Sequence, residues 1–499
     1  GVHTAYKLTN PPDGGAVTGV TSPSGVCLFE KNDRLGGRIR DVQFGPDAGD
    51  VTGTGAYRMY DIQYTYALAN ELGVTTEPSF AYSNLRGLQD PGGNPGQYFG
   101  YSGTAFEGLY GVTMNDDQMW GQLMCGPQVP KSDAGFPDYT AVADGGIATM
   151  STLDYTRSVL GDAGAQYFFD QNRFRADFVS AVDAIGYLQY SVIDYYGPET
   201  VLYPVPGHSA LIGEMKKRIE AAGGRIFLSE PASSVQSQAD GTFTVQTSGH
   251  TVHAKQVVLA VPQGAMSHLT GDVLSTITAA KEFNSVTSAK SMQVTHQWNK
   301  SWWHGDLRYP DAGAVVGGDL PDGSAPILRA DTTIKPDGYC INSIEMPYTA
   351  QRDALMVTRS VYSDDRACVD ANLTLYGDGG TAGVDALNAE ILKSLRILFP
   401  AVFDGTANEP QITKTDVNVH DEAWFYLKTG ATANGVTLKS LFDWSVAPVA
   451  GKNVFLVGDA WYPLGSGWSN AAYISSIRVL DSHFGMSIPS HELQPIACP

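Results

Sequence analysis

The stretch VCLFEKNDRLGGRIR, which begins at position 26, places an acid, two bases and a glycine pair directly behind a short apolar run. Glu30 ends the run, and in a nucleotide-binding βαβ unit an acid at the end of the second strand hydrogen-bonds a ribose hydroxyl pair. Gly36 and Gly37 let the backbone approach a ligand, and Arg34 and Arg38 can balance phosphate charge with forked hydrogen bonds. The spacing therefore favours a pocket for the adenosine and pyrophosphate of a dinucleotide over the alternative, a polar turn with charged flanks.

Apolar runs and helical patterns alternate around this stretch. SALIGEMKKRIEAAGG, which begins at position 209, places apolar residues on one helical stripe and ends in glycines. Short continuous apolar runs are typical of strands covered on both faces. Such runs stand at 26–30, 225–228, 257–262 and 453–458. They predict a parallel α/β sheet, and because its pieces lie far apart in the sequence, the domain that contains it must be discontinuous.

Length and charge narrow the function classes. The chain has 499 residues and a net charge of −20, from 52 acidic and 32 basic residues. The length predicts two or three domains. The negative charge repels phosphate backbones and anionic lipids, so we expect no binding to nucleic acid or membranes.

Several other kinds of site find no support in the sequence. The five cysteines lack CxxC spacing, so we predict no metal site, while one or two disulfides are compatible with the sequence. The motifs GxSxG, GxxxxGK[ST] and HExxH are absent, which disfavours serine hydrolases, P-loop enzymes and zinc proteases.

The motif E-x-x-x-R-x-G-G-R resembles one found in the flavin amine oxidase superfamily, which includes monoamine, polyamine and L-amino acid oxidases. In that family the motif follows the second strand and contacts FAD. The resemblance implies an α/β fold, α+β overall, with a discontinuous Rossmann-like FAD-binding domain, a mixed-sheet substrate domain and a helical region. It assigns FAD contacts to Glu30, Lys31, Arg34, Gly36, Gly37 and Arg38.

The start of the chain resembles the end of the family's glycine-rich turn. Gly1 resembles the third glycine of G-x-G-x-x-G, and the residues behind it resemble the following helix. The first strand and the first two glycines, which hold the pyrophosphate in such a fold, are absent from the sequence. We expect them on an upstream segment or on a separate N-terminal fragment. Strong FAD binding by this chain alone would contradict that expectation.

Further segments continue the resemblance to the end of the chain. VVLAVP resembles the strand that closes the nucleotide site, Gly458-Asp459 resembles a Gly-Glu pair at the middle of the cofactor, and Gly467-Trp468 resembles the Gly-Trp before the last helix. The N-terminus of that helix would point at the flavin edge where negative charge develops on reduction. The resemblance adds these FAD-binding residues: Gly55, Ala56, Tyr57, Arg58, Val235, Val261, Gly458, Asp459, Gly467, Trp468, Ser469 and Ala472.

The tetrapeptide Gly-Ala-Tyr-Arg at 55–58 resembles the G-x-M-R of L-amino acid oxidases, whose arginine binds the substrate carboxylate. A guanidinium suits this role because it matches a carboxylate with two hydrogen bonds and keeps its charge. The alternatives are that Arg58 pairs with a neighbouring acid or contacts phosphate.

Three further residues are candidates for roles near the reaction. Lys290 resembles the family lysine that holds a water near flavin N5 and assists the reaction with oxygen; the alternative is a solvated strand lysine. Trp468 would wall one side of the substrate amine, and the cluster 424–426 could supply a second wall. Tyr339 could supply a hydroxyl for the substrate carboxylate.

Together the resemblance implies oxidative deamination of L-amino acids to 2-oxo acids by hydride transfer from Cα to FAD N5, with O2 reduced to hydrogen peroxide and ammonia released. The alternatives are a polyamine or monoamine oxidase and a non-catalytic flavin-fold subunit. The acidic charge, two sequons and a start without Met favour a secreted or extracytoplasmic protein, and the family favours a homo-oligomer. We predict an FAD-binding domain at 1–60, 197–264 and 446–488, a helical region at 61–196 and a substrate domain at 265–445.

Overall fold

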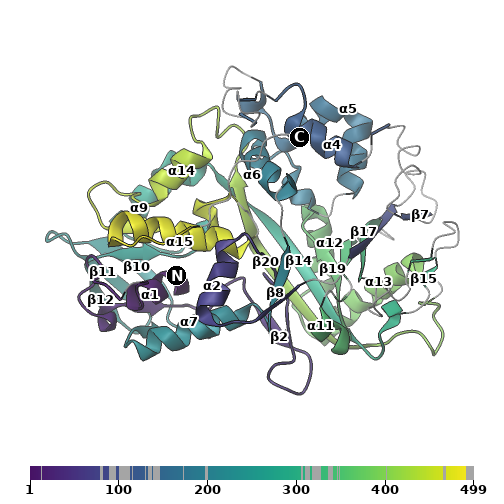
Figure 1. Cartoon of the computed structure of the whole chain (residues 1–499), viewed down its shortest axis with the longest axis horizontal. Coiled ribbons are helices and arrows are strands. Elements are labelled where there is room, and N and C mark those ends of the chain that lie inside the picture. Colours follow the sequence, from purple (N-terminus) through teal and green to yellow (C-terminus); the bar gives the residue numbers. More distant parts are fainter. Residues whose placement is uncertain are drawn as a thin grey trace.

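The computed structural model consists of two lobes with a group of helices above them (Figure 1). One lobe combines the beginning, the middle and the end of the chain, as the discontinuous domain requires, and the other is built on long antiparallel strands. The structure describes residues 1–12, 14–78, 82–88, 97–100, 113–114, 116–129, 131–132, 137–138, 146–171, 174–196, 200–304, 307–308, 315–316, 327–334, 341–345, 347, 349–399, 402–464 and 468–490.

Two parallel strand pairs form the centre of the first lobe. β1 (Cys27–Phe29) pairs with β9 (Arg225–Phe227), and β13 (Val257–Leu259) pairs with β21 (Val454–Leu456). All four strands coincide with predicted apolar runs, so the predicted parallel α/β arrangement is confirmed. The residues of β1 are only half-buried, whereas those of β21 are fully buried, so β1 is not covered on both faces as its sequence suggested.

The two parallel pairs belong to separate sheets, and Gly1 lies between them. A Cβ built on Gly1 would stand 3.1 Å from the Cβ of Ala260, just beyond β13, and 3.4 Å from Cδ1 of Leu28 in β1. Gly1 therefore stands at a close approach of the two pairs, where a side chain would have little room.

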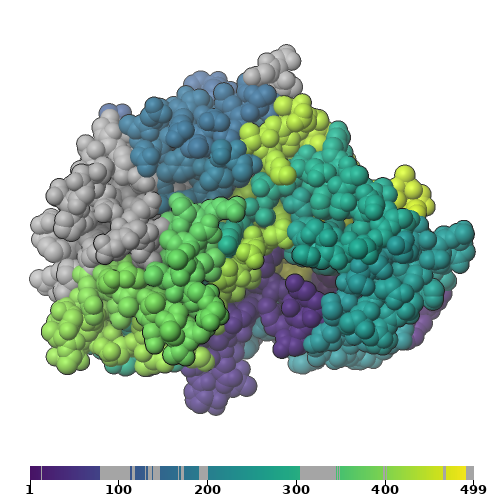
Figure 2. All heavy atoms as spheres, turned by 180° about the vertical axis from the view of Figure 1, so that it is seen from behind, coloured from purple at the N-terminus to yellow at the C-terminus, as the bar shows by residue number. Residues whose placement is uncertain are grey.

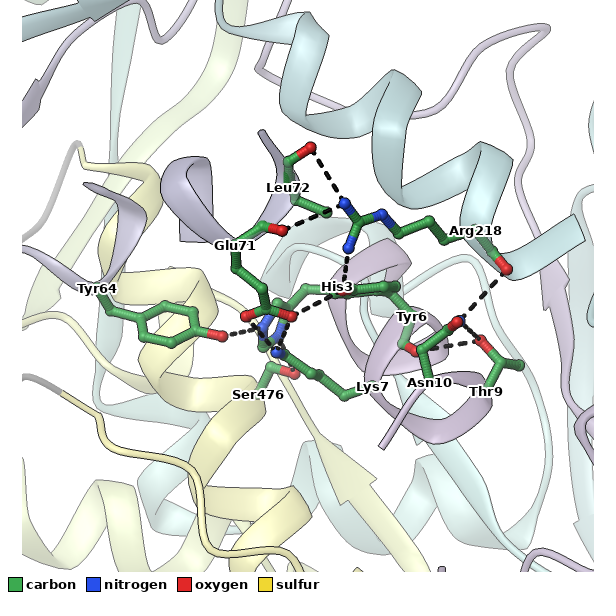
Figure 3. A network of polar contacts seen from close by, with 10 residues as sticks. All are labelled: His3, Tyr6, Lys7, Thr9, Asn10, Tyr64, Glu71, Leu72, Arg218 and Ser476. Atoms are coloured by element: carbon green, nitrogen blue, oxygen red, sulfur yellow. Dashed lines mark hydrogen bonds and ion pairs between the residues drawn. The ribbon is translucent and has the colours of Figure 1, made fainter. Parts of the chain in front are cut away.

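Helix α1 (Val2–Thr9) is packed between α2 (Tyr64–Leu72), α7 (Ser209–Ala221) and α15 (Ser469–Phe484). Its side chains are nearly all buried although several are polar, so each needs a partner. Figure 3 shows how that need is met, through a network made by His3, Tyr6, Lys7, Thr9, Asn10, Tyr64, Glu71, Leu72, Arg218 and Ser476.

An ion pair and a histidine anchor α1 within this network. The ammonium of Lys7, 2% exposed, lies 2.6 and 2.7 Å from the two carboxylate oxygens of Glu71. The two ring nitrogens of His3 lie 2.9 Å from Ser476 Oγ and 3.0 Å from Tyr64 Oη. Burial lowers the pKa of His3 well below its usual value, and nearby Lys7 lowers it further, so the ring is neutral. These contacts fix the direction of α1 and therefore the place of its N-terminus.

The second lobe is a seven-stranded mixed sheet, as predicted. All neighbours are antiparallel except β17 and β6, which are parallel. In order across the sheet, the strands are β20 (Ile412–Leu427), β14 (Val286–Trp298), β19 (Val357–Ser363), β18 (Ile341–Glu345), β17 (Ile327–Ile334), β6 (Tyr82–Leu88) and β7 (Gln97–Gly100). Helices α12 (Arg366–Tyr376) and α13 (Thr381–Leu398) pack against one apolar face of β14 and β19.

The helical region above the lobes is built from α4 (Asp116–Cys125), α5 (Thr152–Gln171), η4 (Arg175–Asp177) and α6 (Ala184–Tyr196). Its aromatic core continues into the sheet through Tyr362, Trp424 and Tyr426. The helical region and the strand lobe therefore share a wall.

The hydrophobic clusters differ in part from the predicted domain boundaries. The core of the first lobe includes α2 and apolar side chains from α9 (Asp272–Ala279) and α14 (Leu438–Ser445). The predicted boundaries assign these segments to the helical region and the substrate domain. They join the first lobe because their apolar faces are buried there.

The remaining elements are short. They are η1 (Pro23–Gly25), β2 (Asp41–Gln43), β3 (Val51–Gly53), β4 (Met59–Tyr60), β5 (Thr76–Pro78), η3 (Ile147–Thr149), β8 (Val201–Pro204), β10 (Ala232–Ser237), β11 (Phe243–Thr247), β12 (Thr251–Ala254), α8 (Gln263–Met266), α10 (Lys281–Asn284), η5 (Trp302–His304), β15 (Leu307–Arg308), β16 (Val315–Val316), α11 (Ala350–Ala354) and η7 (Asp459–Trp461). Cys27 is a free thiol, whereas Cys125 and Cys368 are each disulfide-bonded. Within the described part of the chain, no helix has both the length and the apolar character needed to cross a membrane.

Candidate active site

A cavity of about 2020 Å³ is lined by residues of the first lobe, the strand lobe and the helical region. Seen from behind, the N-terminal residues (purple) lie between the green and teal parts of the molecule (Figure 2). Pockets for a single small ligand usually measure about 300–1,000 Å³. The cavity is therefore large enough for a dinucleotide and a substrate together.

Every described residue that the sequence assigned to cofactor binding lines this cavity, while Gly467 lies outside the described residues. The residues brought together are Gly1, Glu30, Lys31, Arg34, Gly36, Gly37, Arg38, Gly55, Ala56, Tyr57, Arg58, Val235, Val261, Gly458, Asp459, Trp468, Ser469 and Ala472.

The glycine pair forms a tight turn at the cavity wall. Gly36 and Gly37 have φ angles of +108° and +57°, a region that side chains rarely adopt. The guanidinium of Arg34 donates to the carbonyl of Ile39 at 2.9 Å and to that of Gly37 at 2.7 Å. Arg34 therefore fixes the shape of the turn, a role that the sequence did not indicate.

Gly55 is required because the chain passes close to Arg38. A Cβ on Gly55 would lie 1.9 Å from the carbonyl oxygen of Arg38, which no structure tolerates. The amide of Ala56 donates to the same oxygen at 3.1 Å. The segment that carries Arg58 is thus fastened to the turn that carries the glycine pair.

Arg38 and Asp459 join distant parts of the sequence beneath the cavity. Nη1 of Arg38 donates to Asp459 Oδ2 at 2.7 Å and to the carbonyl of Ala423 at 2.6 Å, and Nη2 donates to Asp459 Oδ1. Burial alone would lower the pKa of Arg38, but the charge and hydrogen bonds of Asp459 outweigh it and raise the pKa. The pair holds η7 against the glycine turn.

Two helix N-termini meet the cavity. The first residues of α1, from Gly1 to Ala5, line it, and so do Trp468, Ser469 and Ala472 at the start of α15. Unpaired amides and the helix dipole make such ends attractive to anions. Together with the glycines and the arginine-supported turn, these ends fit the phosphates and the flavin edge of FAD.

Arg58 lies at the end of the cavity beside α15. Its guanidinium carbon is 4.9 Å from the ring centre of Trp468 and 5.6 Å from that of Tyr57. The ring of Trp468 also packs on Tyr60, with 4.3 Å between centroids. The two aromatic rings lie near the guanidinium of Arg58, which lines the cavity and can attract an anionic group there.

The sequence did not point to a second arginine at this end. Arg359 in β19 is buried, lines the cavity, and lies 4.0 Å from the ring centre of Tyr57. Its Nη1 pairs with Glu345 at 2.8 Å, and Tyr57 donates to both oxygens of Glu345 at 3.1 Å. A charged residue inside the apolar alternation VTRSVYS was a signal that could have identified Arg359.

The structure places Lys290 away from the position expected beside the flavin. Lys290 does not line the cavity, and its ammonium lies 3.3 Å from Asp370 and 3.5 Å from Asp421. Side chains alternate along a strand, and in β14 it is Ser291 and Gln293 that line the cavity. The expectation that Lys290 stands beside the flavin is therefore wrong for this structure.

The other expected aromatic and hydroxyl groups differ in their placement. Trp424 lines the cavity and can form the expected second wall, as can Tyr426. Phe425 between them is fully buried in the core of the first lobe, 5.5 Å from the guanidinium carbon of Arg38. Tyr339 lies outside the described residues.

A discontinuous dinucleotide-type domain, a mixed sheet beside it and one shared cavity define a flavin-dependent oxidoreductase. Residues 25–479 match the family described as flavin containing amine oxidoreductase, and the chain belongs to this family. Its cofactor is FAD.

Solved structures with a similar fold include two of putrescine oxidase. A double mutant has a TM-score of 0.61 and 15% identity, over 97% of this chain and 96% of that one. The wild type bound to putrescine has a TM-score of 0.60 and 14% identity, over 96% of both chains. At this identity the likeness shows the fold alone. No curated protein sequence matches the chain.

Proposed function

We propose that this flavin amine oxidoreductase oxidises L-amino acids. Bound FAD would supply the two-electron chemistry, taking up a hydride from the substrate Cα and passing the electrons to O2, which would be released as hydrogen peroxide. Hydrolysis of the resulting imino acid with one water gives the 2-oxo acid and ammonia. The chain itself supplies binding, orientation and exclusion of water.

The observation that carries the proposal is the position of Arg58. An amine substrate has no carboxylate, so a guanidinium at the flavin end of the cavity would oppose the substrate's own cationic form, whereas an amino acid needs such a group. The fastening of residues 55 and 56 to Arg38 sets Arg58 at a fixed distance from the glycine turn. A fixed carboxylate site orients Cα, and this orientation would give the preference for the L-enantiomer.

An oxidase of amines or diamines is the second candidate. The fold likeness to putrescine oxidase permits it, and an acidic residue, Asp177, lines the same cavity. A non-catalytic subunit is disfavoured by membership of an oxidoreductase family.

The test is peroxide release by the FAD-loaded protein against L- and D-amino acids and amines, with Arg58→Ala, Arg58→Lys and the exposed control Arg157→Ala. Loss of a paired charge in a desolvated site costs about 2–5 kcal/mol, so Arg58→Ala should lower kcat/KM for L-amino acids about 30-fold to 5,000-fold. Arg58→Lys should recover only part of this loss, and Arg157→Ala should have no effect. The proposal would be overturned in favour of the second candidate if the wild type oxidised amines and no amino acid, and if Arg58→Ala still oxidised amines.

Extracytoplasmic localisation and assembly into a homo-oligomer stay predictions. Sedimentation of the purified protein tests the second.

A further inference from the structure

Two buried polar side chains face the cavity from β14, next to the edge strand β20. Ser291 and Gln293 in β14 are 0% and 7% exposed and line the cavity. Neither Ser291 Oγ nor Gln293 Oε1 has a hydrogen-bond partner among the described residues. Trp424 on neighbouring β20 is 9% exposed, and its Nε1 also has no hydrogen-bond partner among the described residues. Because buried polar groups rarely go unsatisfied, these atoms indicate a ligand that donates and accepts hydrogen bonds here.

An acid stands at the helical end of the same cavity. Asp177, in η4, lines the cavity, and Tyr426 donates a hydrogen bond to its Oδ1. Tyr187 donates to its Oδ2 at 3.2 Å. These two tyrosines orient the carboxylate at the cavity wall.

A second acid lies behind the first. Asp364 is 2% exposed, accepts the amide of Arg175 at 3.0 Å and the hydroxyl of Tyr362 at 3.3 Å. Burial raises the pKa of Asp364 well above its usual value, and the charge of Asp177 raises it further. The guanidinium of Arg175 lies 3.9 Å from a neighbouring acid, Asp365.

Aromatic rings surround Asp177 at this end. Six aromatic residues of the helical region and the sheet line the cavity, and all belong to or pack against one hydrophobic cluster. They are Trp120, Phe174, Tyr187, Tyr362, Trp424 and Tyr426. An acid within aromatic walls is an environment that favours an organic cation.

The sheet register separates the two ends of the cavity. Gln293 is paired with Tyr362 on β19 and with Asn418 on β20, so it lies level with the aromatic end. Arg359, which packs on Tyr57, stands three positions before Tyr362 on β19. At the rise of a β-strand, the Cα atoms of Arg359 and Tyr362 are at most about 10 Å apart. The cavity thus has guanidinium groups beside Tyr57, and an acid together with buried hydrogen-bond acceptors at the aromatic end.

We propose that the cavity selects L-amino acids whose side chain ends in a cation, an ammonium or a guanidinium, with Asp177 and Gln293 as the specificity-determining residues. This inference rests on the proposed function, since Arg58 has to hold the α-carboxylate for the side chain to extend towards Asp177. Lysine and arginine carry a cation at the end of a long side chain, whereas alanine and serine carry none. The neutral amide of Gln293 and the hydroxyl of Ser291 would accept hydrogen bonds from the cation or its waters.

The experiment compares L-lysine and L-arginine with L-norleucine, which has a similar length and no charge. Peroxide release and anaerobic bleaching of the flavin are measured for the FAD-loaded wild type, Asp177→Asn, Gln293→Met and the control Asp385→Asn on the exposed face of α13. The wild type should prefer the cationic substrates. Asp177→Asn should reduce kcat/KM for L-lysine about 10- to 150-fold, the usual range for a charge-assisted hydrogen bond, mainly through KM, and leave L-norleucine unchanged. Gln293→Met should act in the same direction with a smaller effect.

The outcomes separate this inference from the proposed function. Equal losses for L-lysine and L-norleucine in Asp177→Asn, or a wild type that prefers L-norleucine, would overturn the inference and leave L-amino acid oxidation standing. Oxidation of diamines and of no amino acid would overturn both. A thermal melt of each variant shows whether a loss of activity reflects unfolding, and the ratio between the two substrates is independent of the fraction folded.

Discussion

Replacing Arg38 with methionine removes the cation that accompanies a nearly buried acid. Asp459 has a side chain that is 5% exposed, and Arg38 has one that is 29% exposed, although that exposure is towards the cavity. In Arg38→Met the carboxylate keeps its position and loses both guanidinium contacts, while the carbonyl of Ala423 loses a 2.6 Å hydrogen bond.

The size of the effect follows from burial. Removing one partner of a fully buried pair costs about 3–5 kcal/mol, and because Arg38 is partly exposed we expect about 2–3 kcal/mol. At an unfolding entropy of about 2.1 cal/mol/K per residue, a chain of 499 residues that unfolds as one unit would lose only about 2–3 °C in Tm. Urea unfolding is therefore the more sensitive assay.

The effect should depend on pH with a defined sign. In Arg38→Met a charged carboxylate at position 459 would be buried without its cation, whereas a protonated one would not carry that cost. A lower pH favours the protonated form, so the deficit of Arg38→Met should be smallest near pH 4 and largest at neutral pH. Asp459→Asn added to Arg38→Met should remove this dependence and restore part of the stability.

The control is Lys439→Met, which breaks the exposed pair of Lys439 with Asp443 on α14. Pairs of that kind contribute about 0–1 kcal/mol. Urea midpoints at pH 4.5 and pH 7.5, with FAD in excess, would give the comparison. A deficit for Arg38→Met that equals that of Lys439→Met, or one that grows as pH falls, would refute this account of the pair.

Two further predictions concern the cavity wall and one buried histidine, His296. Gly55→Ala should abolish or strongly weaken FAD retention, because the added Cβ would stand 1.9 Å from the carbonyl oxygen of Arg38. The control Gly213→Ala on α7 has nothing within 4 Å of its added Cβ, so it should be neutral or stabilising by up to about 1 kcal/mol. Flavin fluorescence after gel filtration measures both variants. Burial lowers the pKa of His296 to about 4, so its contribution to the free energy of unfolding should fall by up to about 3 kcal/mol as pH drops from about 6.5 to 4. In His296→Gln the urea midpoint should therefore depend less on pH over that window. A pH dependence of the midpoint equal to that of the wild type would contradict this prediction.

The parts of the site that the sequence predicted are those fixed by local backbone geometry. Gly36, Gly37 and Gly55 are needed where the chain turns or passes close to itself, and such needs leave a short, continuous motif. The strands that follow or precede these motifs are short apolar runs, which periodicity identifies.

The residues that were missed or misplaced depend on long-range register. Arg359 and Gln293 face the cavity only because β19 and β20 pair with β14 in one alignment, and bulges interrupt that alignment on both sides. Lys290 was expected near the flavin because it resembles the family lysine, but a shift of one residue exchanges the faces of a strand, and it is Ser291 that lines the cavity. Asp177 lies on a short turn of helix, and no local pattern marks it as part of a cavity.

The division of the cavity between two cores has a consequence for how specificity can change. The cofactor end is held by the first lobe, where glycines, helix ends and the Arg38–Asp459 pair constrain one another. The far end is held by the strand lobe and the helical region. Arg58 belongs to the first lobe, so the carboxylate site that we propose there would keep its place relative to FAD when residues of the other side change. Substitutions at Asp177 or Gln293 should therefore alter which side chain is accepted without altering FAD affinity or the proposed preference for the L-enantiomer.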